Sequence, residues 1–170
     1  YAEAAELVAE HKDEERDIVV VSASGAEIVT PISDMIGATH SIGTRMVEAN
    51  GKYTGEIEFY CYGENKAVAM KQLAVERNYD LAECHAYSDS ITDVPMLEAV
   101  GHPSTVNPDR ALRKLALERG WPMLTFSKPV SLRSRFQMPS GTTVAITAAS
   151  IGAVAAAGAT WYGIRRRRRK

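Results

Sequence analysis

The sequence predicts an α/β fold in which a mostly parallel sheet is covered by helices on both faces. Strand-like and helix-like segments alternate over residues 1–126, which is typical of a sheet built from strand–helix units. The run 18–21, Ile-Val-Val-Val, is continuously β-branched, as expected for a strand buried on both faces. At 170 residues and 45% apolar composition, the chain has room for about one domain.

The first half of the pattern begins with amphipathic spacing of apolar residues and continues into the β-branched run. Ser22-Ala23-Ser24-Gly25 ends that run, and Asn50-Gly51 is a strong signal for the turn of a β-hairpin. We therefore expect a helix over 1–12 and a strand over 18–21. After Gly25 we expect a helix through about 36–37, an inserted hairpin of strands 41–48 and 53–59, and a helix over 65–78.

The second half repeats the alternation with shorter elements. Asp109 or Asn107 could cap a helix, and Gly120-Trp121-Pro122 would end it. We expect a strand over 84–88, a helix over 93–100, a strand over 104–106, a helix over 110–119 and a strand over 123–126.

Charge is distributed unevenly. Residues 1–118 hold all 21 acidic residues against 10 basic ones, a net charge of −11, whereas residues 119–170 hold 10 basic residues and no acid. An acidic body is a poor match for nucleic acid, because Lys and Arg contacts to phosphate dominate that affinity. Cys61 and Cys84 form no metal-binding pair and fit a reducing compartment, although a single disulfide between them stays open.

The C-terminal segment has a different character from the rest. Residues 127–141 indicate a linker, residues 142–164 run without a charge for the length of a bilayer span, and residues 165–170 are six consecutive cations. The segment is rich in alanine, so a disordered or surface-bound tail is the alternative to a transmembrane helix. Its small residues Ala148, Gly152 and Ala156 would permit a homodimer through the span.

The membrane orientation is not fixed by these residues. The cations at the C-terminal end favour a C-terminus in the cytoplasm. The unpaired cysteines instead favour a membrane-tethered protein whose acidic domain lies in the cytoplasm.

The turn Ser88-Asp89-Ser90-Ile91-Thr92-Asp93 is the strongest candidate site. Asp89 and Asp93 lie where a strand ends and a helix begins, at the edge of the sheet where open α/β folds bind ligands. Mg²⁺ takes oxygen ligands and usually only one or two protein carboxylates. In the alternative interpretation, Asp89 starts an Asx-turn and Asp93 caps the helix.

Other polar residues follow neighbouring elements. The Ser22 hydroxyl and the backbone N–H groups after it, at Ala23, could hold a phosphate, or Ser22 could simply cap a helix. Lys66 opens a helix, and the helix macrodipole disfavours a cation at that end. We therefore expect a bound anion or the two aspartates beside Lys66. The alternative is a solvated lysine on the surface. Asn107 ends a strand and could also be only a turn residue.

These stretches resemble the haloacid dehalogenase superfamily of phosphotransferases in its class IB, phosphoserine-phosphatase-like branch. The resemblance covers about residues 1–126 and implies a three-layer Rossmann-like sheet, with residues 1–12 as the end of a helical cap. The matching motifs are Val19-Val20-Val21-Ser22-Ala23-Ser24, Gly51-Lys52-Tyr53-Thr54-Gly55, Gly63-Glu64-Asn65-Lys66, Tyr87 to Leu97, and Val106-Asn107-Pro108-Asp109.

The resemblance implies a role for each candidate residue. Ser22, Ala23 and Asn107 would contact the phosphoryl group, and Lys66 would offset its charge. Asp89 would bind Mg²⁺ directly, and Asp93 would bind it through water or orient Lys66. The implied activity is Mg²⁺-dependent hydrolysis of a small phosphorylated metabolite through an aspartyl-phosphate.

One departure limits this expectation. The Asp-x-Asp-x-Thr/Val motif of the family, which supplies the nucleophile, does not occur in the sequence. We therefore expect a C-terminal fragment with a sheet incomplete at its N-terminus, inactive alone. The alternative is a non-enzymatic, membrane-tethered interaction module.

Overall fold

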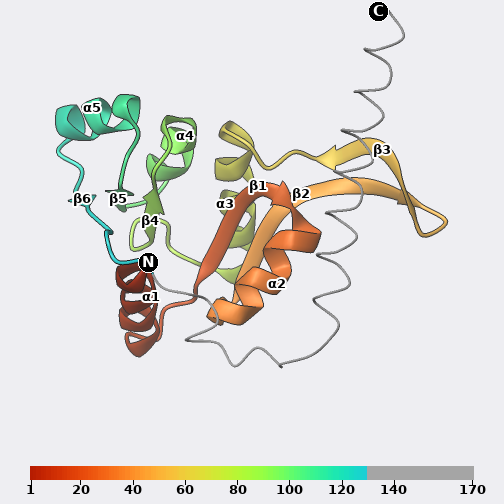
Figure 1. Cartoon of the computed structure of the whole chain (residues 1–170), viewed down its shortest axis with the longest axis horizontal. Helices are drawn as coiled ribbons and strands as arrows, with labels where there is room; N and C mark the ends of the chain where they lie inside the picture. The colour runs from red at the N-terminus through yellow and green to blue at the C-terminus, as the bar shows by residue number, and fades with distance from the viewer. Residues whose placement is uncertain (130–170) are drawn as a thin grey trace, which may run out of the picture. The chain divides into compact units, whose positions relative to one another are not determined.

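A computed structural model describes residues 1–129, which form an α/β unit (Figure 1). The expected order of strands and helices is present throughout. The predicted linker from residue 130, the candidate membrane span 142–164 and the basic tail lie outside the described residues. No helix within residues 1–129 is long and apolar enough to cross a membrane.

The first half of the unit is a three-stranded sheet in the order β1-β2-β3. β1 pairs with β2 in parallel, and β2 and β3 form the predicted antiparallel hairpin. Asn50 and Gly51 have φ angles of 54° and 72°, as a tight hairpin turn requires. The elements are α1 (Ala2–Asp13), β1 (Val19–Gly25), α2 (Ala26–Ile36), β2 (His40–Ala49), β3 (Lys52–Phe59) and α3 (Glu64–Arg77).

The second half is a separate parallel sheet in the order β4-β5-β6. Its strands alternate with short helices, and Asp109 caps the last helix by accepting a hydrogen bond from the Leu112 N–H at 2.8 Å. The elements are β4 (His85–Ser88), a 3₁₀ turn η1 (Ile91–Asp93), α4 (Val94–Leu97), β5 (His102–Val106), α5 (Arg110–Arg119) and β6 (Met123–Leu124).

The two faces of β4 are covered by different helices. Ala86 packs with Leu97, Val100 and Leu112 in a buried apolar cluster from α4, α5 and the turn after α4. On the other face, His11 of α1 contacts Tyr87, with 2.8 Å between the His11 Nε2 and the Tyr87 hydroxyl. This half of the molecule is therefore the three-layer arrangement that the sequence predicts.

Within residues 1–129 the strands form two three-stranded sheets. Several element bounds differ from the sequence-based expectation. The helix expected over 93–100 is a 3₁₀ turn followed by the short α4, and the last strand stops at Leu124 instead of residue 126. Position 101 accepts only glycine, because a Cβ there would lie 1.7 Å from the carbonyl oxygen of Ala82.

Candidate functional site

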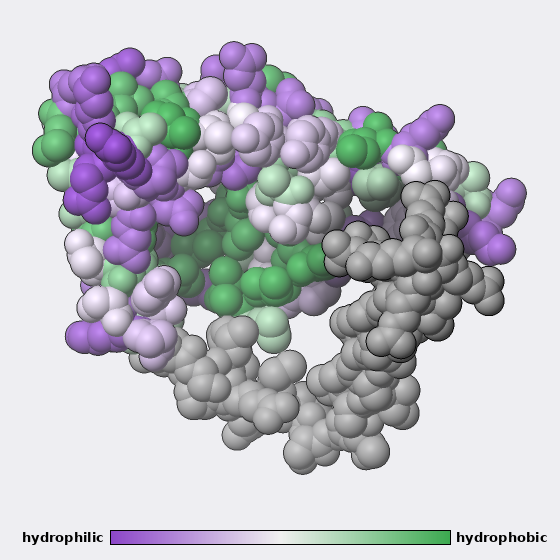
Figure 2. Space-filling view, turned by 45° about the horizontal axis from the view of Figure 1, so that its top comes forward, coloured by the Kyte–Doolittle hydropathy of each residue, from purple (hydrophilic) through white to green (hydrophobic). Residues whose placement is uncertain are grey.

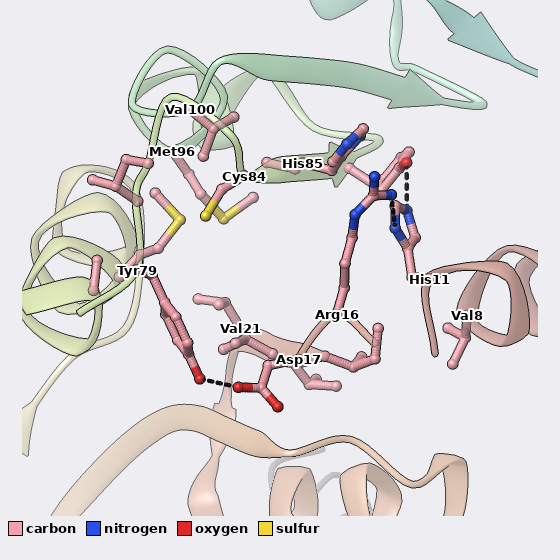
Figure 3. Close-up of a pocket in the computed structure, with 18 of the residues that line it drawn as sticks. Val8, His11, Arg16, Asp17, Val21, Tyr79, Cys84, His85, Met96 and Val100 are labelled. Atoms are coloured by element: carbon pink, nitrogen blue, oxygen red, sulfur yellow. Dashed lines mark hydrogen bonds between the residues drawn. The ribbon is translucent and has the colours of Figure 1, made fainter. Parts of the chain in front are cut away.

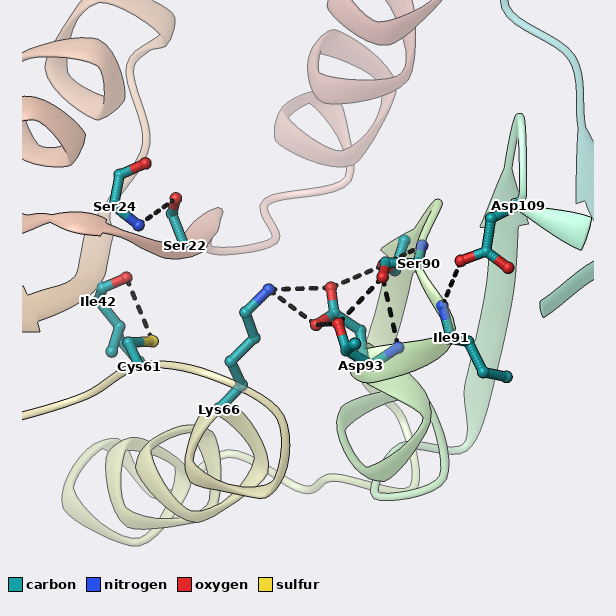
Figure 4. A network of polar contacts seen from close by, with 11 residues as sticks. Ser22, Ser24, Ile42, Cys61, Lys66, Ser90, Ile91, Asp93 and Asp109 are labelled. Atoms are coloured by element: carbon teal, nitrogen blue, oxygen red, sulfur yellow. Dashed lines mark hydrogen bonds and ion pairs between the residues drawn. The ribbon is translucent and has the colours of Figure 1, made fainter. Parts of the chain in front are cut away.

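Lys66 and Asp93 form a buried ion pair beyond the carboxyl end of β4. The Lys66 Nζ lies 2.8 Å from Oδ1 and 2.9 Å from Oδ2 of Asp93, so one ammonium contacts both carboxylate oxygens (Figure 4). The two side chains are 11% and 9% exposed. Lys66 is the third residue of α3, where the helix dipole disfavours a cation, and Asp93 supplies the compensating charge.

Hydroxyl groups of the turn after β4 complete the hydrogen bonding of Asp93. Ser88 donates to Oδ2 at 2.7 Å, and Thr92 donates to Oδ1 at 3.4 Å. Ser90 caps the 3₁₀ turn by accepting from the Thr92 N–H. Both oxygens of Asp93 therefore contact Lys66 and a hydroxyl group of the turn, and the choice between its two expected roles stays a prediction. The roles of Ser88 and Thr92 were not predicted, although the hydroxyl-rich composition of the turn is a signal for them.

Asp89 lies at the opposite end of the same turn and is exposed. Its backbone oxygen accepts a hydrogen bond from the Asp109 N–H at 2.8 Å. The Asp109 carboxylate in turn accepts from the Ile91 N–H at 2.8 Å as well as from Leu112. These backbone donors hold the pKa of Asp109 below its ordinary value. Asp109 therefore attaches the turn that contains Asp89 to the N-terminus of α5.

Ser22 lies within β1 rather than at a helix N-terminus. β1 continues to Gly25 and α2 begins at Ala26, so the N-cap of α2 is Gly25 and not Ser22. The Ser22 hydroxyl accepts a hydrogen bond from the Ser24 N–H at 3.2 Å, and the Ala23 carbonyl accepts one from Thr44. Both residues are half-buried, and their phosphate-binding role stays a prediction.

Cys61 connects the part of the site on β1 with the part on α3. It is fully buried, its Sγ donates a weak hydrogen bond to the Ile42 carbonyl at 3.9 Å, and its backbone N–H donates to Thr44. Burial raises the pKa of the Cys61 thiol, while the nearby Lys66 ammonium and Ser22 backbone act in the opposite direction. Thr44 accepts from the Cys61 N–H and donates to the Ala23 carbonyl, so it links Cys61 to β1, a link that the spacing of the cysteines in the sequence does not indicate.

Asn107 is engaged in a different contact. Its side-chain amide donates to the Phe126 carbonyl at 2.8 Å, and its side-chain oxygen accepts from the Phe126 N–H at 3.0 Å. Its φ of 44° places it in the left-handed region that asparagine tolerates. Asn107 therefore ties the end of β5 to the segment after β6, and a contact to phosphate stays a prediction.

The donor set can be tested against a bound magnesium ion. Within residues 1–129 there is no cluster of three or more acidic, histidine or cysteine side chains suited to a metal. Asp93 is occupied by Lys66, so Asp89 is the carboxylate of this turn that solvent reaches. A single carboxylate fits Mg²⁺, which commonly retains several waters and binds substrate phosphate, but it does not fit a closed protein cage.

Comparison with known sequences places the chain in a family. The family model for haloacid dehalogenase-like hydrolases matches residues 1–98. The chain is 60% identical over 167 residues to a protein of Mycobacterium tuberculosis described as a probable phosphatase, covering 98% of this chain and 58% of that protein. It is 53% identical to the inhibition of morphological differentiation protein of Streptomyces azureus, covering 98% of this chain and 62% of that protein. The chain thus spans about three fifths of the length of these relatives.

Solved structures share the fold. A protein of unknown function from Bordetella pertussis matches with a TM-score of 0.68 and 33% identity, over 73% of this chain and 57% of that one. A substrate-bound phosphoserine phosphatase matches with a TM-score of 0.57 at 20% identity, over 74% of this chain and 57% of that one, which shows a common fold. Because the family model covers more than half of the 170 residues, the chain belongs to the haloacid dehalogenase-like hydrolase family.

Proposed function

We propose that the intact protein is a phosphatase that hydrolyses phosphomonoesters of small metabolites, with phosphoserine among the candidate substrates. The observation that carries this proposal is the buried Lys66–Asp93 pair at the carboxyl end of β4. The similarity to a protein described as a probable phosphatase supports it.

Each side chain has a physical role in this reaction. Phosphoryl transfer needs positioning and electrostatic stabilisation of charge that is spread over the phosphoryl oxygens. Lys66 supplies a cation whose position is fixed by both oxygens of Asp93, so little reorganisation is needed when the substrate binds. The Ser22 hydroxyl, which is half-buried on β1, would donate a hydrogen bond to the phosphoryl group.

Asp89 is the residue that we assign to magnesium. The ion, held by this exposed carboxylate, would neutralise charge on the phosphate. In this proposal the acceptor is an aspartate that becomes phosphorylated, and it lies outside the 170 residues, which contain no Asp-x-Asp motif.

Phosphate release by the intact protein tests the proposal. Asp89→Asn and Lys66→Met should each lower kcat by roughly a hundredfold or more, because each removes charge stabilisation of the transition state. Asp13→Asn, an exposed substitution of the same chemical type at the end of α1, is the matched control and should leave kcat unchanged.

The magnesium dependence separates the two variants. Asp89→Asn should require more magnesium for half-maximal activity, and Lys66→Met should not. Full turnover by Asp89→Asn at limiting magnesium would contradict the assignment, and no phosphate release from any monoester by the wild-type protein would contradict the proposed function.

A further inference from the structure

Positive charge is concentrated on α5 and in the sequence that follows it. Residues 110–170 hold 13 basic residues and one acid, whereas residues 1–109 hold 7 basic residues and 20 acids. Figure 1 shows α5 at one edge of the described unit, and in Figure 2 hydrophilic residues cover that edge with hydrophobic ones between them. α5 is therefore a basic element on an acidic unit.

The cations of α5 lie on the face that points away from the core. Leu112 and Ala116 are fully buried on the opposite face. Arg110, Arg113 and Lys114 are exposed, and their spacing of three and four residues places them side by side on the helix. The helix therefore presents three neighbouring cations to solvent.

The stability of the helix does not explain two of these cations. Arg110 and Arg113 occupy the first turn of α5, where the helix dipole disfavours positive charge. Neither guanidinium forms an ion pair with a carboxylate of the described residues, and the Asp109 carboxylate accepts from backbone N–H groups instead. Lys114 pairs with Glu118 at 3.8 Å, an exposed contact of a kind that contributes little. The three charges are therefore available to an anionic partner.

A leucine lies among these cations. Leu117 is 66% exposed and follows Arg110, Arg113 and Lys114 by seven, four and three residues, so it shares their face. Figure 3 shows where other apolar side chains gather, around a cavity of about 700 Å³, and Leu117 is not part of that lining. The outer face of α5 thus combines an apolar group that faces solvent with positive charge around it.

An anionic lipid surface fits this combination. In helices that lie in a membrane interface, basic side chains contact the anionic headgroups and apolar side chains enter the boundary of the acyl chains. Nucleic acid would match the charges through its phosphates, but its backbone offers the leucine no apolar layer. The sequence after the described residues has the same character, because residues 142–164 carry no charge and residues 165–170 are six consecutive cations.

We propose that the outer face of α5, formed by Arg110, Arg113, Lys114 and Leu117, docks on a membrane surface that contains anionic lipid. The three cations contact headgroups, and the leucine enters the layer beneath them. Each cation close to such a surface strengthens binding about fivefold, and the three together about a hundredfold. The inference concerns binding alone and does not depend on the proposed phosphatase activity.

Vesicle binding by the 170-residue chain tests the charges. The vesicles consist of phosphatidylcholine alone or of phosphatidylcholine with phosphatidylserine, and sedimentation measures the bound fraction. The wild-type chain should prefer the anionic vesicles. The triple variant Arg110→Gln/Arg113→Gln/Lys114→Gln should bind them about a hundredfold more weakly, because it removes all three headgroup contacts.

The triple variant Lys52→Gln/Lys71→Gln/Arg77→Gln is the matched control, because it removes the same charge from exposed positions outside α5. It should keep the wild-type affinity within about threefold, since salt screens charges that lie away from the lipid surface. An equal loss of affinity in both triple variants would show a response to net charge alone and would overturn the proposal. Equal binding of the wild-type chain to neutral and anionic vesicles would also overturn it.

A photoreactive lipid tests the position of Leu117 in the wild-type chain. A diazirine in the acyl chain labels protein groups that enter the lipid layer, and mass spectrometry locates the label. Labelling should occur at Leu117 and not at Val75 of α3, which is 83% exposed. Leu117→Ser should weaken binding about tenfold, whereas Val75→Ser should leave it unchanged. Absence of label from α5, or unchanged binding of Leu117→Ser, would overturn the proposal.

Discussion

At the scale of single residues, the ion pair of Lys66 and Asp93 is the group with the largest expected energetic effect. Both side chains are about nine-tenths buried, and each satisfies the charge of the other. Removing one partner of a buried pair leaves an uncompensated charge and typically costs roughly 3–5 kcal/mol, whereas removing both costs far less.

A double-mutant cycle measures this coupling. We expect Lys66→Met and Asp93→Asn each to lower the free energy of unfolding by roughly 3 kcal/mol, and the double variant to lose clearly less than the sum. Asp93→Asn keeps an oxygen for the Ser88 hydroxyl, so the cycle isolates the charge pairing from that hydrogen bond. Chemical denaturation of the four proteins is the measurement, and additive losses would show that the pair is not coupled.

At the scale of elements, the sequence predicts where the functional residues lie better than what they contact. Lys66 in the first turn of α3 and Asp109 as the cap of α5 follow from local signals, and both are confirmed. The pairing of Asp93 with Lys66 joins residues 27 positions apart, and Asn107 reaches 19 positions to Phe126. No local pattern distinguishes such a partner from a metal or a phosphate.

The length of β1 shows a second limit of local patterns. The β-branched run ends at Val21, yet β1 extends to Gly25 because Gly25 still pairs with Thr44 of β2 after an irregularity in register. Ser22 therefore lies inside a strand instead of capping a helix. Pairing with a distant strand, and not the residues themselves, decides this boundary.

Helix α1 carries a contact that depends on protonation. The Arg16 guanidinium donates to His11 Nδ1 at 2.9 Å, which places the proton of neutral His11 on Nε2, facing the Tyr87 hydroxyl. Burial, and then Arg16, lower the pKa of His11; burial and Arg16 also lower the pKa of His85, whose ring centroid lies 5.0 Å away. Because the pKa of His11 is lowered in the folded protein, neutral His11 stabilises the fold above the pKa of histidine in the unfolded chain, about 6.5. This stabilisation is lost as pH falls through the pKa of His11 in the folded protein.

Amide exchange over α1 measures this loss. After correction for intrinsic rates, the opening equilibrium of Ala2–Asp13 should increase below pH 6.5 by up to about tenfold per pH unit, because protonation breaks the Arg16 contact. His11→Gln should remove much of this response. His40→Gln, a histidine of β2, is the control and should retain it. An identical pH response in His11→Gln would contradict the assignment.

At the scale of the whole described unit, polar contacts connect the two halves near both ends of β4. The Lys66–Asp93 pair links α3 to the turn after β4 at one end. The Tyr79 hydroxyl and the Asp17 carboxylate link the segments before β4 and β1 at the other. Polar contacts thus join the two halves both at the candidate site and away from it.

The stability contributed by the Asp17–Tyr79 contact depends on pH. The hydrogen bond from Tyr79 lowers the pKa of Asp17, and burial, followed by Asp17, raises the pKa of Tyr79 to about 12. The contribution of Asp17 to the free energy of unfolding is lost as pH falls through its lowered pKa. The contribution of Tyr79 is lost as pH rises from about 10 through 12. The contact is therefore complete between about pH 5 and about pH 9.

Tyr79→Phe removes this contact while keeping the ring. Because Asp17 is exposed to solvent, we expect a loss of about 1 kcal/mol or less in the free energy of unfolding, constant from about pH 5 to about pH 9 and shrinking on both sides. Urea denaturation across that range is the measurement. Tyr62→Phe, which changes an exposed tyrosine, is the matched control. A loss that does not vary with pH would mean that the hydroxyl acts through packing and not through its hydrogen bond to Asp17.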